Sequence, residues 1–278
     1  MKRFSNGFAA RSINLLPAGE REAVIVLRSA DELAILREAN QILARIMQEL
    51  REEIEVGIST EALDRKAERL IEATGGKPAF KGYRGYPKTI CTSINEQVVH
   101  GIPSPNVFLE EGDILSIDIG IFHRGYVGDT AATFAVGAIS DEKKRLIRVT
   151  RESLYQGIHR AREGNRLSDI SHAVQSHVER QGFSVVRDFV GHGIGQRMHE
   201  EPQIPNFGRP HLGPRLQAGM VLAIEPMVNA GTHEVKVLSD RWTAVTKDGR
   251  PSAHFEHSVA VTKGDPEILS LSPFDEAV

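Results

Sequence analysis

The chain contains one short apolar segment twice, and each copy carries a carboxylate at the same place. Residues 112–120 read Gly-Asp-Ile-Leu-Ser-Ile-Asp-Ile-Gly, and residues 219–227 read Gly-Met-Val-Leu-Ala-Ile-Glu-Pro-Met. Asp118 and Glu225 are therefore equivalent positions, separated by 107 residues (225 − 118). A repeat at a fixed offset in a chain of 278 residues favours two half-domains fused around a single core.

Each half continues into a second strand that carries an acid near its start. Asp129 occupies this place in the first half, and Glu256 occupies it in the second. Apolar side chains alternate with the acids, so that Ile117 and Ile119 point away from the face that carries Asp118. Four carboxylates thus occupy related places on four predicted strands. Because a carboxylate buried among apolar strands needs compensation, the pattern predicts a bound cation.

Two helices are predicted before the strands of each half, from capping residues and apolar positions at helical spacing. In the first half, one helix covers about residues 30–52, and the next begins at Ser59 and ends at Gly75-Gly76. In the second half, one helix begins at Ser140, and the next extends from Leu167-Ser168 to Gly182. The expected units are an N-terminal extension, residues 1–28, and a single domain, residues 29–278, with half-repeats of about 29–137 and 138–270.

The composition excludes several classes of protein. A formal charge of −3 offers no basic surface for nucleic acid. The lone cysteine, Cys91, excludes an internal disulfide and a cysteine-rich zinc module. No apolar stretch approaches the roughly 20 residues of a membrane span, and a secretory signal is missing. We therefore expect a cytoplasmic protein that acts on neither nucleic acid nor membranes.

The first residues have a composition of their own. Residues 1–18 contain basic residues and serines but no acid, which favours a frayed tail, with an organellar transit segment as the alternative. Neither capping nor ligand residues precede Ser29. We therefore expect that deletion of residues 2–20 leaves catalysis intact.

A hairpin turn is predicted between the first two acidic strands. Residues 122–125 read Phe-His-Arg-Gly, and a turn centred between His123 and Arg124 would place Asp118 directly opposite Asp129. Their Cβ atoms would then lie about 5 Å apart across the two strands. Two unpaired anions at that distance repel each other, and a shared divalent ion resolves the conflict.

A histidine in a glycine-rich loop completes a predicted dinuclear site. His192 lies in Gly-His-Gly-Ile-Gly, whose spacing does not fit a dinucleotide-binding loop. One imidazole added to four carboxylates gives a full ligand set for two ions. His100 lies in a loop that resembles the His192 loop, and His199 follows His192 by seven residues. Both are candidates for proton transfer and for stabilising an oxyanion. Seven further histidines show no catalytic motif and are predicted to be structural or solvated: His123, His159, His172, His177, His211, His233 and His254.

Seven short motifs occur in order along the chain: Cys91-Thr-Ser-Ile-Asn95, Val-His100-Gly-Ile-Pro, Gly128-Asp-Thr, Gly-His192-Gly-Ile-Gly, His199-Glu-Glu-Pro, Ile-Glu225-Pro-Met and Phe-Glu256-His. With these motifs in this order, the chain closely resembles the type I methionine aminopeptidases from about residue 29 to 270. The resemblance implies an α+β protein with the pita-bread fold, a curved antiparallel sheet backed by helices with a pseudo-twofold internal repeat. It implies removal of the N-terminal methionine from nascent proteins and peptides whose second residue is small.

The resemblance also assigns roles to residues. Asp118 would bind one metal ion, Asp129 and Glu256 would bridge two ions, and His192 and Glu225 would complete the second. His100 and His199 would act as auxiliary catalytic histidines, and Glu225 would take a proton from the attacking water. The residues that would enclose the methionine side chain are Tyr83, Tyr86, Cys91 and Trp242. Phe80 and Met198, at the pocket rim, depart from some relatives, which concerns pocket size rather than chemistry.

The expected cofactors are two divalent ions, with manganese, iron or cobalt favoured by four oxygen donors and one imidazole, and zinc left open. The expected partners are the N-terminal methionine of a nascent polypeptide or peptide and, as a candidate, the ribosome; a monomer is expected.

Two alternatives stay open: a proline-directed exopeptidase similar to aminopeptidase P or prolidase, and a non-catalytic binding scaffold on the same fold. The complete ligand set argues against the scaffold, and the 28 residues before the first predicted helix are too few for the extra domain of a proline-directed enzyme.

Overall fold

The computed structural model describes residues 24–272, so the predicted tail and most of the predicted extension lie outside the described residues. Within that range the helices are α1 (Ala30–Glu52), α2 (Thr60–Ala73), α3 (Asp141–Ile158) and α4 (Leu167–Arg180), with a short 3-10 turn η1 (Tyr83–Gly85). The longer strands are β2 (Ile90–Ile94), β4 (Ile114–His123), β5 (Tyr126–Ala135), β8 (Glu200–Ile204), β9 (Val221–Ile224) and β14 (Glu256–Ala260). The shorter strands are β1 (Lys77–Pro78), β3 (Gln97–Val99), β6 (Ser184–Val185), β7 (Gly191–Gly193), β10 (Met227–Asn229), β11 (Val235–Val237), β12 (Ala244–Thr246), β13 (Ser252–His254) and β15 (Glu267–Ile268).

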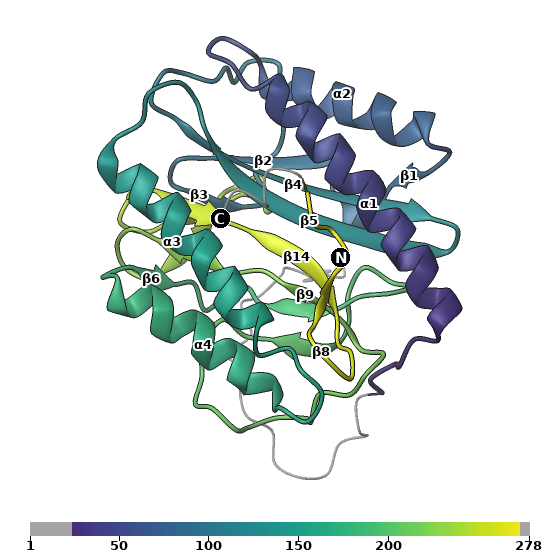
Figure 1. Cartoon of the computed structure of the whole chain (residues 1–278). Coiled ribbons are helices and arrows are strands. Elements are labelled where there is room, and N and C mark those ends of the chain that lie inside the picture. The colour runs from purple at the N-terminus through teal and green to yellow at the C-terminus, as the bar shows by residue number, and fades with distance from the viewer. Residues whose placement is uncertain (1–23, 273–278) are drawn as a thin grey trace, which may run out of the picture.

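One antiparallel sheet joins the two halves of the chain. Its central path runs β1-β4-β5-β14-β9-β7-β8, while β2 pairs with β4 and β15 pairs with β14. Strand β14, the last long strand, lies between β5 of the first half and β9 of the second (Figure 1). The seam between the halves is therefore made by β5 and β14, which carry Asp129 and Glu256.

The offset of 107 residues recurs in the structure. Helix α2 begins at Thr60 and α4 at Leu167, and β4 begins at Ile114 and β9 at Val221. The first three helices have serine N-caps, at Ser29, Ser59 and Ser140, whose side chains accept a backbone N–H of the first turn. The predicted helices and the internal repeat are thus confirmed.

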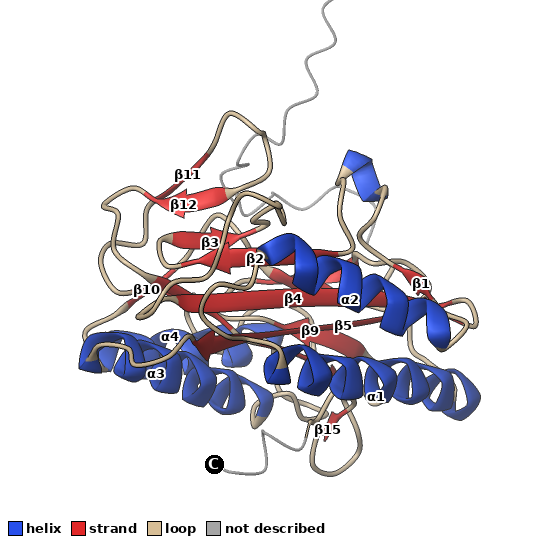
Figure 2. Cartoon of the chain, turned by 90° about the horizontal axis from the view of Figure 1, so that it is seen from above, coloured by secondary structure: helices blue, strands red, loops and turns tan. Residues whose placement is uncertain are grey.

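Helices cover one face of the sheet and leave the acidic face to the site. Ile117, Ile119 and Ile121 of β4 are fully buried in a cluster with apolar residues of α1 and α2, such as Leu43 and Leu63. Figure 2 shows α1, α3 and α4 along one side of the sheet and the hairpin β11–β12 on the other. Because side chains alternate along a strand, Asp118 must face away from this helical layer.

The predicted hairpin register was wrong by two residues. Strands β4 and β5 pair His123 with Tyr126, so the turn is centred between Arg124 and Gly125. Asp118 therefore faces Ala131, and Asp129 faces Gly120. Gly125 has a φ of 87°, which glycine adopts without strain and which explains why the turn moved one residue along the chain. A shift of two residues in pairing keeps both acids on the same face, so they remain diagonal neighbours.

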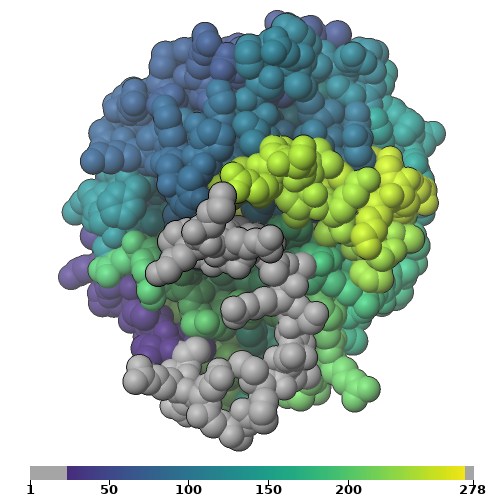
Figure 3. Space-filling view, turned by 180° about the vertical axis from the view of Figure 1, so that it is seen from behind, coloured from purple at the N-terminus to yellow at the C-terminus, as the bar shows by residue number. Residues whose placement is uncertain are grey.

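One of two three-stranded sheets, β11-β12-β3, attaches part of the second half of the chain to the first half. Strand β12 pairs with β11 and with β3, and Figure 3 shows this C-terminal segment in yellow-green against the blue first half. The connection brings Trp242, just before β12, close to His100, just after β3. Among the described residues, no helix combines the length and the apolar character that a membrane span requires.

Arg28, near the start of the described residues, is anchored to the second half. Its side chain, 4% exposed, forms an ion pair with Glu200, which is 7% exposed, and its backbone N–H donates to the carbonyl oxygen of Gly219 (2.8 Å). A Cβ atom at Gly195 would overlap the guanidinium, so that glycine makes the close approach feasible. Glu200 follows His199 directly, and Arg28 therefore fixes the loop that carries this histidine.

We predict that Arg28→Met lowers the free energy of unfolding by about 3–5 kcal/mol, because it removes the ion-pair partner of the buried Glu200 carboxylate and leaves it only the hydrogen bond from the backbone N–H of Arg197 (3.1 Å). The matched control is Arg37→Met, whose ion pair with Glu267 is more than a third exposed on both sides and is worth about 0–1 kcal/mol. Urea unfolding of both variants measures the difference. Equal losses in the two variants would contradict the buried role of Arg28.

Candidate active site

Five predicted ligands come from five consecutive strands of the large sheet. Along the path β4-β5-β14-β9-β7 they are Asp118, Asp129, Glu256, Glu225 and His192. Glu225 lies one residue beyond the end of β9, before Pro226, and the other four lie within their strands. The order in the sheet differs from the order in the chain, and only the sheet order makes these side chains neighbours.

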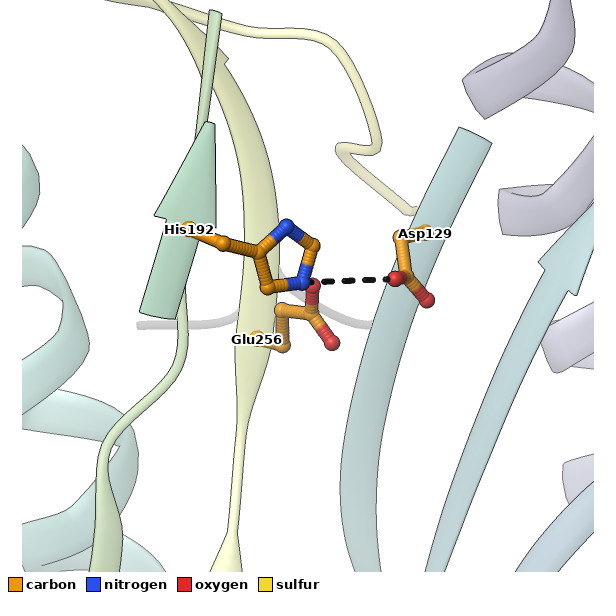
Figure 4. A group of neighbouring side chains, drawn as sticks. All are labelled: Asp129, His192 and Glu256. Carbon is orange, nitrogen blue, oxygen red and sulfur yellow. Dashed lines mark ion pairs between the residues drawn. The ribbon is translucent and has the colours of Figure 1, made fainter. Parts of the chain in front are cut away.

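The donor atoms lie within the spacing that a shared cation needs. His192 Nε2 lies 3.9 Å from Asp129 Oδ2 and 3.4 Å from Glu225 Oε1. Asp129, His192 and Glu256 offer ligand atoms that all lie within 4.8 Å of one another, and Figure 4 shows their side chains pointing toward one another from three strands. These distances are too long for good hydrogen bonds and suit several ligands of one ion.

Buried oxygen atoms without a hydrogen-bond partner support a cation at this place. Asp118 Oδ1, Asp129 Oδ1 and Glu256 Oε1 all lack one. Burial, opposed by His254 and reinforced by Glu225, raises the pKa of Asp118 to about 7. Burial, and then the neighbouring acids, raise the pKa of Asp129 and of Glu256 well above the ordinary values, and burial alone does so for Glu225. The chain therefore leaves compensation of this charge to a bound ion, and the residues present fit a divalent metal.

His192 is held in the tautomer that a metal ligand requires. Its Nδ1–H donates to the carbonyl oxygen of Gly193 (3.0 Å), which leaves Nε2 unprotonated toward the carboxylates. Burial lowers the pKa of His192 to about 4, so the ring is neutral at pH 7. Cβ atoms at Gly191 and Gly193 would overlap carbonyl oxygens of Ala223 and Glu201, so both flanking glycines are required by the close packing of β8 and β9.

Asp129 is supported from the helical layer. Asn40 of α1 is fully buried, and its Oδ1 accepts the backbone N–H of Asp129 (3.2 Å). A Cβ atom at Gly128 would lie 3.2 Å from the α1 backbone, so the strand approaches this helix closely. The contact ties the backbone of an acid at the seam to the core and limits its movement.

His199 stands beside His192, as its predicted role requires. The two ring centroids lie 4.3 Å apart, and Tyr83 hydrogen-bonds His199 Nδ1 through its hydroxyl (2.8 Å) while stacking on the ring. Desolvation, then His192 and Arg84, lower the pKa of His199 to about 3. The ring is therefore neutral at pH 7. A cavity of about 260 Å³ adjoins both histidines, and Arg197, Glu201 and Gln203 also line it.

His100 and three of the predicted pocket residues form a second group next to the acids. His100 has a φ of 61°, unusual for a residue other than glycine, and its ring meets Phe189 and Trp242 edge to face. The ring of Tyr86 also meets Trp242 edge to face, with centroids 5.1 Å apart. Cys91 pairs with Asp118 across β2 and β4, so the thiol lies on the same face as this acid.

Burial, and then His254 and His199, lower the pKa of His100 to about 4, so His100 is neutral at pH 7. Burial, and then Asp118, raise the pKa of the Cys91 thiol, which is therefore neutral as well. The hydroxyl of Tyr86 donates to the carbonyl oxygens of Ile90 (2.9 Å) and Gly101 (3.1 Å), so its polar end is satisfied by backbone. The surface left beside Asp118 is apolar and aromatic.

Phe80 and Met198, the two positions at which the chain departs from some relatives, are neighbours in space. A Cβ atom at Gly120 would lie 2.7 Å from Phe80 Cε1 and 3.1 Å from Met198 Cε. Both side chains pack in a cluster with Tyr83. Gly120 lies two residues after Asp118 and on the same face, so these side chains form a wall beside the acids.

His254, which was predicted to be structural or solvated, lies among the candidate ligands. The residue is 2% exposed, its Nε2 lies 3.7 Å from Glu225 Oε2, and it forms a second group of candidate ligands with Glu225 and Glu256. It precedes Glu256 by two residues, which is the spacing that puts two side chains on one face of an extended segment. That spacing was the available signal in the sequence.

Comparison with known proteins agrees with this geometry. A family model described as metallopeptidase family M24 matches residues 34–263. The chain belongs to this family. Methionine aminopeptidase 1 of Bacillus subtilis is 55% identical over 247 residues, which cover 89% of the chain and 99% of that protein. The predicted resemblance to type I methionine aminopeptidases is thereby confirmed.

Solved structures confirm the predicted pita-bread fold. The crystal structure of methionine aminopeptidase from Thermotoga maritima matches with a TM-score of 0.88 and 44% identity, covering 89% of this chain and 99% of that one. The prolidase of Pyrococcus horikoshii matches with a TM-score of 0.73 but 22% identity, and the chain covers 64% of it. The likeness to prolidase shows the shared fold alone and gives no support to a proline-directed activity.

We predict that Glu256→Gln raises the melting temperature of the metal-free protein, because it removes one of several mutually repelling buried charges. The same variant should lose most of the rise in melting temperature that manganese produces, which at a hundredfold excess over Kd corresponds to about 2.7 kcal/mol. Differential scanning calorimetry with EDTA and with manganese measures both effects.

The matched control is Asp64→Asn. Asp64 is equally buried, but it accepts the backbone N–H groups of Thr89 and Ile90 (2.8 and 3.0 Å). This variant should be less stable in both conditions and should keep the manganese effect. A Glu256→Gln protein that manganese stabilises as much as the wild type would refute the assignment of Glu256 as a ligand.

Proposed function

We infer that the chain removes N-terminal methionine from polypeptides whose second residue is small. The single observation that carries this inference is the convergence of four carboxylates, two of them buried and two partly buried, and His192 on one point of the sheet, beside an apolar and aromatic surface. The family and the methionine aminopeptidases at about half identity support the same reaction. A free N-terminus is required, so the activity is that of an exopeptidase.

Asp118, Asp129, His192, Glu225 and Glu256 would hold the divalent ions, which when bound would supply Lewis acidity and lower the pKa of a water molecule. Glu225 stands at the end of β9 with one oxygen toward His192 and is placed to accept the proton of that water. We assign the Tyr83 hydroxyl as the donor to His199 Nδ1, which leaves the proton of the neutral ring on Nε2. That N–H can donate to the substrate carbonyl oxygen as negative charge develops on it.

His100 stands on the opposite side of the group, between Phe189 and Trp242. We propose that its neutral ring contacts the scissile amide nitrogen. The methionine side chain would lie against Tyr83, Tyr86, Cys91 and Trp242, with Phe80 and Met198 at the rim. A flexible thioether suits this apolar surface, and a β-branched side chain would be excluded by shape.

The donor set favours manganese, iron or cobalt, because carboxylate oxygens and one imidazole are harder ligands than the thiolates that copper seeks. We propose that the protein is a cytoplasmic monomer that meets its substrates as they leave the ribosome. The proposed catalytic domain covers residues 29–278, with half-repeats of about 29–137 and 138–270. The order of helices and strands within residues 24–272 supports this division.

Substrate selectivity tests the function directly. We expect Met-Ala-Ser to be hydrolysed with a kcat/KM about a hundredfold above that of Met-Lys-Ser, a difference of about 2.7 kcal/mol that steric exclusion can supply. Ala-Pro-Ala, a probe for the proline-directed alternative, should be left intact. Assays run with added manganese or cobalt. Equal rates for the first two peptides, or faster hydrolysis of Val-Ala-Ser than of Met-Ala-Ser, would exclude the proposed selectivity.

Loss of a proposed bridging ligand should abolish catalysis in a folded protein. We expect Asp129→Asn and Glu256→Gln each to lower kcat by several orders of magnitude, because each carboxylate would serve both ions. The exposed acid Asp141, paired with Lys144 on the surface, gives a control, and Asp141→Asn should keep full activity. Activity within tenfold of the wild type in either bridging variant, at saturating metal, would refute the dinuclear assignment.

A further inference from the structure

His254 is a buried imidazole whose Nε2 has no hydrogen-bond partner in the described structure. The residue ends β13, and Phe255 separates it from Glu256, which begins β14. The side chain also interacts electrostatically with Asp118. A polar nitrogen that is this deeply buried and points at carboxylates requires a partner.

The distance from His254 to Glu225 decides between a hydrogen bond and shared coordination. Nε2 lies 3.7 Å from Glu225 Oε2, which is beyond the range of a good N–H···O hydrogen bond. Two donors that each lie about 2.1 Å from one ion are separated by about 3 to 4.2 Å. His192, a proposed ligand, stands in the same relation to Glu225, with 3.4 Å between Nε2 and the other carboxylate oxygen, Oε1.

The backbone of His254 is fixed on both sides of the residue. Thr133 Oγ1 accepts the backbone N–H of His254 (2.9 Å) and donates to its carbonyl oxygen (2.8 Å). The same hydroxyl oxygen lies 2.8 Å from Ser116 Oγ, and His254 pairs with Met227 across β13 and β10. The imidazole is therefore presented to the acids by a rigid support, as metal ligands usually are.

Two groups of candidate ligands share one carboxylate. Asp129, His192 and Glu256 form the first group, and Glu225, His254 and Glu256 form the second, so that Glu256 belongs to both. Each group contains one imidazole. We propose that His254 is a protein ligand of the ion on the Asp118 side of the centre, here called the second ion, and that Glu225 and Glu256 contact this ion as well as the ion beside His192. The inference rests on the proposed function only in requiring that two ions bind.

Metal titration separates the roles. Isothermal titration with manganese should find two ions per wild-type chain, whereas His254→Ala should bind the second ion at least about tenfold more weakly and keep the first. His254→Gln, which retains a hydrogen-bonding group but not the imidazole, should show the same loss. The control His123→Gln alters a histidine that pairs with Glu38 at the far end of β4, and it should keep both ions.

A cysteine at this position gives a readout that a structural role would not produce. In His254→Cys loaded with cobalt, a coordinating thiolate should add an intense near-ultraviolet charge-transfer band that the wild type lacks. The buried thiol Cys91 is present in both proteins, so it cancels in the comparison. A folded His254→Cys protein that holds two cobalt ions without this band overturns the inference, and so does wild-type affinity for both ions in His254→Ala.

The outcomes distinguish this inference from the proposed function. If the wild type cleaves Met-Ala-Ser and His254→Ala binds two ions normally, only the role of His254 is refuted. If wild-type protein binds two ions but cleaves none of the methionine peptides, the proposed function fails while the ligand assignment stands. A wild-type protein that binds fewer than two ions refutes the ligand assignment itself.

Discussion

Four carboxylates in the middle of one antiparallel sheet repel one another, and the need to compensate their charge governs the rest of the structure. The acids lie on adjacent strands with several oxygen atoms that have no protein partner. A sheet of this kind is stable only because its other face is buried against helices, which holds the strands in register despite the repulsion. The apolar layer therefore stabilises the arrangement that creates the site.

The same burial sets the state of the histidines. Desolvation holds the pKa of His100, His192 and His199 far below the ordinary value, so all three rings are neutral at pH 7. A neutral ring can ligate a metal or donate one hydrogen bond in a defined direction. Backbone contacts and Tyr83 then decide which nitrogen is available, through the bonds of His192 to Gly193 and of His199 to Tyr83.

The internal repeat explains how one chain brings so many ligands together. Each half supplies two strands with acids, and β14 of the second half inserts beside β5 of the first. Two further contacts join parts of the chain that lie far apart in sequence. Strand β12 pairs with β3, and Arg28 forms an ion pair with Glu200. The residues that line the site come from both halves, so neither half contains a complete ligand set.

Local patterns in the sequence determined the helices, their caps, the repeat and the five predicted ligands, because capping residues, periodicity and an acid within an apolar strand act over short distances. Tertiary structure decided the strand order, which makes Glu256 the neighbour of Asp129, and the hairpin register, which depends on Gly125 adopting a positive φ. It also brought His254 to Glu225. These relations join residues far apart in the chain, and they are fixed by pairing and packing that no short segment of sequence contains.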